Sequence, residues 1–390
     1  MQNDLLKSQF LLKPGITFLN FGSFGACPKP VFETYQNFQL QLEQEPVQFI
    51  AFNGPKNLQH SREKLAQYVH CDADDIVYVT NPSYAVNIVA KNFKLNPGDE
   101  VLGTSIEYGA CDRIWSYYCE KAGASYIRQP VELPLVSKEK FIEDFFKGLT
   151  SKTKAVFISH ITSTTALIFP VKEIVAIAKE KGLFTIIDGA HAPGHLPLNI
   201  TTLDVDAYTG ACHKWMCAPK GCSFLYVRKE LQHVFDPLVV SWGYKAAMPS
   251  HAQFIDYHQM QGTRDFSAFL TVPKLIEFLN ENNWEQVAAD CRKLAQSNYQ
   301  RFCDLLNTQP LAPVTDEFIG QMCSMQIQTG APEKLQRLLY EEYNIEIPVM
   351  RQDDKTYLRY SINAFNSQDD LDKLYDALSN IIQHTDLLHV

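Results

Sequence analysis

The chain has 390 residues, 46% of them hydrophobic and 20% charged, which is the balance of a folded globular protein with room for two domains and a large core. Its formal net charge is −9 and it has no run of consecutive Lys and Arg, which argues against a nucleic-acid partner and an anionic membrane surface. A small-molecule partner is the better expectation.

The N-terminus and the cysteines indicate the compartment. Residues 1–4 lack a basic region followed by an apolar stretch, and no apolar segment reaches membrane-spanning length, so we predict a cytoplasmic protein. The ten cysteines include no Cys-x-x-Cys pair, and the spacing of Cys212, Cys217 and Cys222 matches no common zinc site. We therefore expect reduced thiols and no metal site.

Short apolar strands alternate with helical segments from about residue 60 to 230. This alternation predicts an α/β fold with a mostly parallel sheet covered by helices. The expected strands are 76–80, 100–102, 155–159, 184–187 and 223–227, and the expected helical segments are 85–90, 114–121 and 171–181.

The pattern changes after Asp265. Helical spacing then dominates and strands become few, which predicts a smaller α+β domain with a boundary near residue 265. The expected helices are 273–280, 284–307, 332–343 and 368–383, and the expected strands are 321–328 and 357–362.

Residues 80–84 join a strand to a helix, with Pro82 near the first helical turn. The exposed amides and the Ser83 hydroxyl could hold a phosphate at the positive end of that helix. The alternative is a plain helix cap.

Two consecutive strands carry an acid and a lysine. The strand 184–187 ends at Asp188, and the next strand leads to Lys214. A lysine amine forms a Schiff base with the aldehyde of pyridoxal 5′-phosphate (PLP), and a carboxylate keeps the pyridine nitrogen protonated, so the pair predicts PLP. Partial burial would lower the pKa of Lys214. The alternatives are a capping Asp188, a solvated Lys214, and Lys220 as the Schiff-base lysine.

Two histidines accompany this pair. His191 lies three residues after Asp188 and is placed to bind the ring oxygen of the cofactor, while His213 precedes Lys214. Either could instead be a core histidine.

Several motifs occur in one order, and together the region from about residue 15 to 370 resembles the class V aminotransferase group, most closely its isopenicillin N epimerase-like members. The resemblance implies fold type I of the PLP-dependent transferases, with a seven-stranded, mostly parallel sheet in the large domain. It divides the chain into an N-terminal segment 1–25, a large domain 26–265 and a small C-terminal α+β domain 266–390. The motifs are Asn20-Phe21-Gly22-Ser23-Phe24-Gly25, Glu107-Tyr108-Gly109, Asp188-Gly189-Ala190-His191, His213-Lys214-Trp215, Ser241-Trp242-Gly243-Tyr244 and Gly262-Thr263-Arg264-Asp265.

The resemblance also implies a role for each matching residue. Lys214 and Asp188 are the Schiff-base lysine and the pyridinium partner. Cofactor contacts are implied for Tyr108, which stacks on the ring, for His191 and Ser163 near the ring hydroxyl, for Ser83 and His213 at the phosphate, and for Tyr84. Tyr108 is also the candidate acid that epimerisation needs on the other face of the ring. Thr263 is implied to reach the phosphate of a neighbouring subunit, so a homodimer is expected. Arg359 is implied to bind the substrate α-carboxylate, and Phe21 to border the substrate pocket. We also expect Trp242 at that pocket, and Arg264 as the cation for a second carboxylate of an aminoadipyl-type substrate.

Two positions depart from the pattern: Ala211 stands where many relatives have a polar residue, and Phe21 where the epimerase-like members often have histidine. The implied reaction begins at the α-carbon of an amino acid, and an epimerase or racemase is the leading prediction. A C–S lyase, a cysteine desulfurase-like enzyme and an aminotransferase are alternatives. Residues 348–355 lack the cysteine that desulfurases need, and the presence of Lys214 and Asp188 argues against a non-catalytic binding protein.

Overall fold

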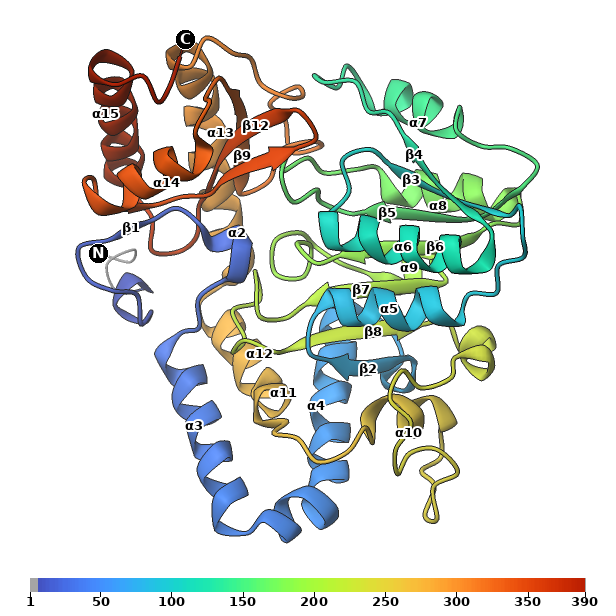
Figure 1. Ribbon diagram of the computed structural model, residues 1–390. Coiled ribbons are helices and arrows are strands. Elements are labelled where there is room, and N and C mark those ends of the chain that lie inside the picture. Colours follow the sequence, from blue (N-terminus) through green and yellow to red (C-terminus); the bar gives the residue numbers. More distant parts are fainter. Residues whose placement is uncertain (1–5, 390) are drawn as a thin grey trace.

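A computed structural model describes residues 6–389, so residues 1–5, part of the basis for the cytoplasmic prediction, lie outside the described residues. A seven-stranded sheet forms the centre of the larger part of the molecule, in the order β2-β8-β7-β6-β5-β3-β4 (Figure 1). Its strands are β2 (Ile76–Val79), β3 (Glu100–Thr104), β4 (Ser125–Gln129), β5 (Thr153–Ser159), β6 (Phe184–Gly189), β7 (Ala207–Ala211) and β8 (Ser223–Val227).

Strand direction brings six strand ends to one edge of this sheet. β4, β3, β5, β6 and β7 are parallel, whereas β8 is antiparallel to both β7 and β2. β2 therefore runs in the same direction as the parallel strands. Ligands of such sheets bind beyond the carboxyl ends of the strands, so this edge is where a site is expected.

Helices cover both faces of the sheet. Alternate residues of β2 belong to different cores: Val77 and Val79 pack with α5 (Pro82–Asn92) and α6 (Gly109–Ala122), while Ile76 and Tyr78 belong to the other core, which includes α8 (Val171–Glu180). Burial on both faces explains why the central strands are nearly continuous apolar runs. No helix within residues 6–389 is long and apolar enough to cross a membrane.

The smaller part is built on an antiparallel sheet in the order β11-β12-β9. Strand β1 (Thr17–Phe18) pairs in parallel with β10 (Ile345–Glu346), so the N-terminal segment lies beside this part. Its remaining elements are β9 (Met322–Ile327), β11 (Val349–Gln352), β12 (Lys355–Ser361), α13 (Trp284–Leu305), α14 (Pro332–Glu341) and α15 (Gln368–His384).

Several elements were not predicted from the sequence. Strand β4 is a half-exposed edge strand without an apolar run, and α7 (Lys138–Phe146) follows it. Long helices α3 (Lys29–Gln44) and α4 (Gly54–Val69) contact the short helices α11 (Ser267–Leu270) and α12 (Val272–Glu281). The domain limits at residues 25 and 265 stay predictions.

Candidate active site

Five segments meet at the carboxyl edge of the sheet. Each follows a strand that runs in the common direction: β2, β3, β5, β6 or β7. The parallel register places Asp188 of β6 next to Ser159 of β5 and Thr209 of β7. The predicted residues on these segments are Ser83, Tyr84, Tyr108, Ser163, Asp188, His191, His213 and Lys214.

Lys214 lies in the turn after β7, and its Nζ atom is 3.1 Å from Nε2 of His191. Burial lowers the pKa of the Lys214 amine to about 8; the negative charge of Asp188 opposes this effect, and the positive charge of Arg359 adds to it. The lowered pKa leaves more of the amine neutral near neutral pH than an ordinary lysine has, which suits a nucleophile or a general base.

Asp188 is buried at the end of β6. Its Oδ1 atom accepts a hydrogen bond from the backbone N–H of Ala190 at 3.0 Å, and its Oδ2 atom lies 3.4 Å from the Cys111 sulfur, whose thiol donates. Burial raises the pKa of Asp188, while the Ala190 amide, the Lys214 charge and the thiol lower it. These partners hold the carboxylate in one orientation and favour its ionised form.

His191 connects Lys214 to the core. Its Nδ1 atom accepts a hydrogen bond from the indole Nε1 of Trp215 at 3.2 Å. Burial moves the pKa of His191 well below its ordinary value, and the charges of Lys214 and Arg359 act in the same direction. The imidazole is therefore neutral.

Gly25 closes the N-terminal segment over this turn. Its φ of +66° lies in the left-handed region, and a Cβ atom there would be 2.3 Å from the His213 carbonyl oxygen and 2.7 Å from the Lys214 carbonyl oxygen. Only glycine allows so close a backbone approach. This contact brings α2 (Phe21–Phe24) to the site.

The first turn of α5 carries the backbone N–H groups that were expected to bind a phosphate. The Asn81 side chain caps the helix by accepting from the Tyr84 amide at 2.8 Å, so Asn81 rather than Ser83 is the cap. The Tyr84 hydroxyl donates to Gln261 at 3.1 Å. On the turn after β7, His213 Nδ1 lies 2.9 Å from the Cys222 carbonyl oxygen, and burial lowers the His213 pKa to about 4.

Arg359 is fully buried on β12, and its guanidinium joins segments far apart in the sequence. Nη1 donates to the Ser163 backbone carbonyl and Nη2 to the Ser23 hydroxyl at 3.3 Å, while Nε has no hydrogen-bond partner among the described residues. Burial lowers its pKa to about 10, which still leaves it charged at neutral pH. A Cβ atom on Gly22 would lie 2.5 Å from Sδ of Met322 and 3.2 Å from Nη2, so the glycine makes room chiefly for Met322 beside the guanidinium.

The remaining residues predicted for the site differ in burial and in the groups that they contact. Tyr108 begins α6 and is 47% exposed. Phe21 is fully buried against Trp215, so its ring supports the indole rather than presenting a surface to a ligand. Trp242 is 82% exposed, and Thr263 is also exposed. Arg264 lies over the Phe269 ring (5.2 Å), and no hydrogen bond or ion pair between residues 6 and 389 joins it to Lys214.

The structure adds residues that the sequence did not suggest for the site: Cys111 beside Asp188, Trp215 beside His191, and Glu107. Glu107 is fully buried and accepts hydrogen bonds from the Thr104 hydroxyl (2.7 Å) and the Ser159 amide (2.9 Å). Its position directly before Tyr108 was the only feature of the local sequence that could have indicated a place for Glu107 in the site. Nothing in the sequence pairs Cys111 with Asp188.

The donor set fits PLP. A carboxylate and an amine interact at the ends of neighbouring strands, a helix N-terminus with its own cap lies at the same edge, and Nε of Arg359 is an unused buried donor. Within residues 6–389, no group of His, Cys, Asp and Glu side chains is arranged to hold a metal ion.

Comparisons with known proteins give the same assignment. The family described as Aminotransferase class-V matches residues 26–374. An isopenicillin N epimerase of Amycolatopsis lactamdurans is 30% identical, covering 96% of this chain and 97% of the relative. A putative L-cysteine desulfhydrase 1 of Oryza sativa subsp. japonica is 27% identical, covering 94% and 83% respectively. A solved structure of C-DES, with glycine covalently linked to its PLP cofactor, has a TM-score of 0.83 at 21% identity and covers 96% and 99%. This likeness confirms the predicted fold.

Proposed function

The chain belongs to the class V aminotransferase family, and we propose that within it the chain is an amino-acid epimerase or racemase similar to isopenicillin N epimerase. PLP is its cofactor. When bound, PLP withdraws electrons from the α-carbon of the substrate, which makes the α-proton acidic. Lys214 and Asp188 are the residues that would hold its reactive carbon and its ring nitrogen.

The observation that carries the proposal is the environment of the Lys214 amine. Its pKa of about 8, its contact with a neutral His191 and its interaction with Asp188 suit a base that removes and returns one proton near neutral pH. Asp188 contributes a negative charge that Cys111 and Ala190 hold in place.

Arg359 supports an amino-acid substrate. A guanidinium binds a carboxylate with two parallel hydrogen bonds, and a buried guanidinium binds it more strongly than an exposed one. Ser163 and Ser23 fix its orientation from two other segments. We assign it to the α-carboxylate, which orients the α-proton toward Lys214.

Epimerisation also needs a proton donor on the opposite face of the α-carbon. We assign this role to the Tyr108 phenol, at the start of α6 and partly open to solvent. Arg264 and Trp242 are proposed to meet the distal end of the substrate.

Incubation with single L- and D-amino acids in deuterated water tests the proposal. We expect deuterium at the α-carbon together with formation of the other enantiomer. Lys214→Ala should abolish both the exchange and the visible absorption band of the bound cofactor, whereas Lys220→Ala, six residues along the chain and exposed, should keep both. Absence of α-deuteration with every amino acid would overturn the proposal.

A C–S lyase is the second candidate, because a putative L-cysteine desulfhydrase is also similar over 94% of the chain. It would share the first step and then break the Cβ–S bond of cysteine, so that the products, with one added water, are hydrogen sulfide, ammonia and a keto acid. A desulfurase-like route is less favoured because residues 348–355, at β11 and its turn, contain no cysteine. A keto acid formed without sulfur release would instead indicate an aminotransferase.

We further propose a cytoplasmic homodimer in which Thr263 serves the phosphate site of the partner chain. Its exposure in one chain supports this, since a partner would cover it. A mixture of Lys214→Ala and Thr263→Val chains should then bind PLP more tightly than either variant alone, because one complete site forms per mixed dimer. A monomer in sedimentation, or no gain on mixing, would overturn the arrangement.

A further inference from the structure

A continuous line of contacts runs from the core to Lys214. The Trp215 indole Nε1 lies 3.2 Å from Nδ1 of His191, and Nε2 of the same imidazole lies 3.1 Å from the Lys214 amine. Trp215 is fully buried and His191 nearly so. The two nitrogens of one imidazole therefore have different and fixed partners.

The chemistry of these partners determines where the proton of His191 sits. An indole N–H can only donate, so Nδ1 of His191 must accept. A neutral imidazole carries one proton, which must then be on Nε2, the nitrogen that faces Lys214. A doubly protonated imidazole would place two N–H groups against each other at Nδ1.

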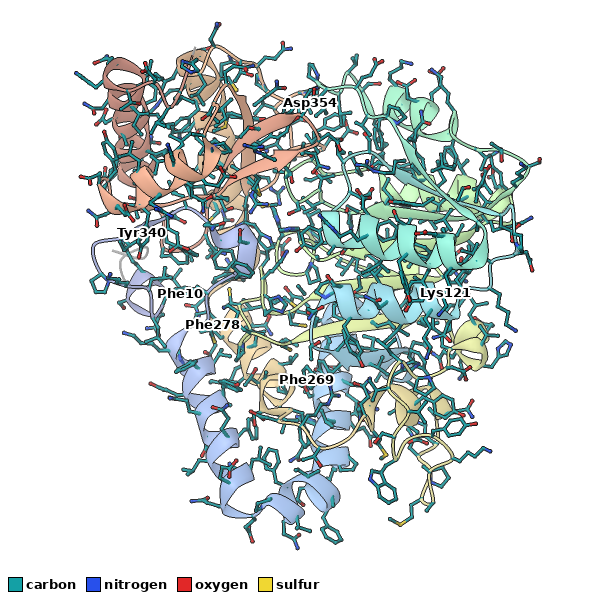
Figure 2. All side chains as sticks on the ribbon, in the orientation of Figure 1. Phe10, Lys121, Phe269, Phe278, Tyr340 and Asp354 are labelled. Atoms are coloured by element: carbon teal, nitrogen blue, oxygen red, sulfur yellow. The ribbon has the colours of Figure 1, made fainter. Side chains whose placement is uncertain are left out.

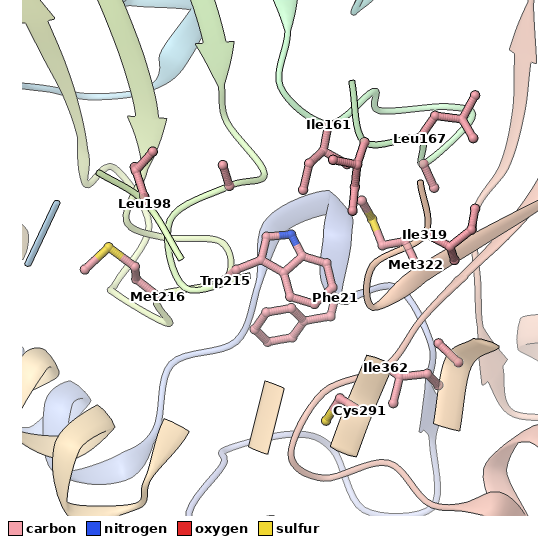
Figure 3. Packing of buried hydrophobic residues seen from close by; sticks show 14 of the residues in the cluster. Phe21, Ile161, Leu167, Leu198, Trp215, Met216, Cys291, Ile319, Met322 and Ile362 are labelled. Atoms are coloured by element: carbon pink, nitrogen blue, oxygen red, sulfur yellow. The ribbon is translucent and has the colours of Figure 1, made fainter. Parts of the chain in front are cut away.

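The indole has little freedom to move. Phe21 packs on it with ring centroids 5.0 Å apart, as Figure 3 shows, and the His195 ring lies 4.1 Å away. His195 in turn accepts a hydrogen bond from the Gln321 backbone N–H at 2.6 Å. The direction of the indole N–H is thus set by segments from both parts of the molecule.

We propose that Trp215 is a positioning residue that fixes His191 in the Nε2–H tautomer and so directs the imidazole proton toward Lys214. With that proton in place, the Lys214 amine can pair with His191 only by accepting, as a neutral base. The same tautomer can donate to the ring oxygen of PLP. This inference rests on the proposed role of Lys214 and is independent of the choice between epimerase and lyase.

Several charged groups near Lys214 and His191 also influence the protonation of these two side chains. The titratable and charged groups that interact with Lys214 or His191 are Asp188, Arg359, Cys111, His195 and His213. None of them bonds to Nδ1 of His191, which Trp215 occupies. Removal of the indole N–H would let the imidazole proton move to Nδ1, and Nε2 could then accept from a protonated Lys214.

Nuclear magnetic resonance of the full-length protein with ¹⁵N-labelled histidine, before and after removal of PLP, tests this directly. His191→Gln identifies the His191 signals. The wild type should show the Nε2–H tautomer, and Trp215→Phe should shift the tautomer ratio toward Nδ1–H by about tenfold, the effect of losing one hydrogen bond. Phe21→Leu, which removes the ring packed on the indole but keeps the N–H, should leave the tautomer unchanged.

The pH dependence of PLP capture by the PLP-free chain is a second readout. Its midpoint should rise by up to about one pH unit in Trp215→Phe and stay constant in Phe21→Leu. An Nδ1–H tautomer in the wild type overturns the proposal even if Trp215→Phe does not fold. An unchanged ratio in folded Trp215→Phe, or equal changes in both variants, overturns it as well. Failure of the α-deuteration assay alone would overturn the proposed function and leave this result intact.

Discussion

The thiol of Cys111 lies 3.4 Å from Oδ2 of Asp188, although the two residues are 77 positions apart. α6 delivers the cysteine and β6 the carboxylate, and both side chains are buried. The thiol supplies a second donor to a carboxylate whose pKa is raised by burial. Cys111 therefore helps to keep Asp188 charged in the position where the cofactor nitrogen must be held protonated.

Cys111→Ala should weaken PLP binding by about three- to tenfold, because Asp188 loses one hydrogen bond to its ionised form. Titration followed by visible absorption measures this. Cys111→Ser keeps a donor and should bind nearly as the wild type does. Cys119→Ala, a buried cysteine on the same helix, is the control for packing. Equal weakening in the Ala and Ser variants would contradict the hydrogen-bond role.

The rate of PLP capture by the PLP-free chain should rise with pH and level off above about 8. The neutral amine of Lys214 is the nucleophile, and burial lowers its pKa to about 8 by destabilising the cation. Asp188 stabilises that cation, so Asp188→Asn should move the midpoint to lower pH. Stopped-flow absorption measures both profiles. An unchanged midpoint in Asp188→Asn would show that the carboxylate does not interact with Lys214.

Glu107 should make the free energy of unfolding depend on pH. Burial raises its pKa from 4.5 to about 8, although hydrogen bonds from Ser159 and Thr104 oppose the shift. Between these values the folded chain keeps a proton that the unfolded chain has released, so stability falls as pH rises from about 5 to about 8. The slope from this group is at most about 1.4 kcal/mol per pH unit.

Glu107→Gln should remove that part of the pH dependence. A glutamine cannot ionise; its oxygen can accept from Ser159, and its nitrogen can donate to the Thr104 oxygen once the Thr104 hydroxyl turns away from it. Denaturant unfolding at pH 5.5, 7 and 8.5 measures the difference, with the exposed Glu120→Gln on α6 as control. Parallel curves for the wild type and Glu107→Gln would mean that Glu107 is ionised in the folded protein.

Arg359→Lys should raise KM by about 100-fold and change kcat less, because a lysine cannot bind a carboxylate at two points and the loss of charged hydrogen bonds costs about 3 kcal/mol. Steady-state kinetics measures this. Arg351→Lys, an exposed arginine on the neighbouring strand β11, should have no effect. Affinity for the matching amine without an α-carboxylate should be the same in the wild type and Arg359→Lys, and a loss there would assign Arg359 a structural role instead.

An ion-pair contact joins the two parts of the molecule at residues 348–355, the segment without the cysteine that desulfurases need. The turn between β11 and β12, where Figure 2 labels Asp354, is joined to the large sheet by Arg128, which pairs with Asp353 at 3.3 Å and with Asp112 at 3.2 Å. The turn is therefore anchored beside α6.

The fold class and the cofactor were both predictable from the amino-acid sequence. Apolar strands such as 184–187 and 223–227 are recognisable because burial on both faces demands continuous apolar residues. The acid after one strand and the lysine after the next predicted PLP, and the family assignment confirms that prediction. The role of Arg359 came only from the resemblance and stays a prediction.

Only the tertiary structure decided which side chains meet. The edge strand β4 was not predicted from the sequence, because it is half exposed and has no apolar run. Cys111, Glu107 and Trp215 lie beside Asp188, Ser159 and His191, respectively, because strand order and helix packing bring distant segments together. The local sequence determines where a strand ends. The hydrogen-bond partner of a buried polar group depends instead on the packing of the whole chain, because that partner can come from any segment that the fold places beside the group.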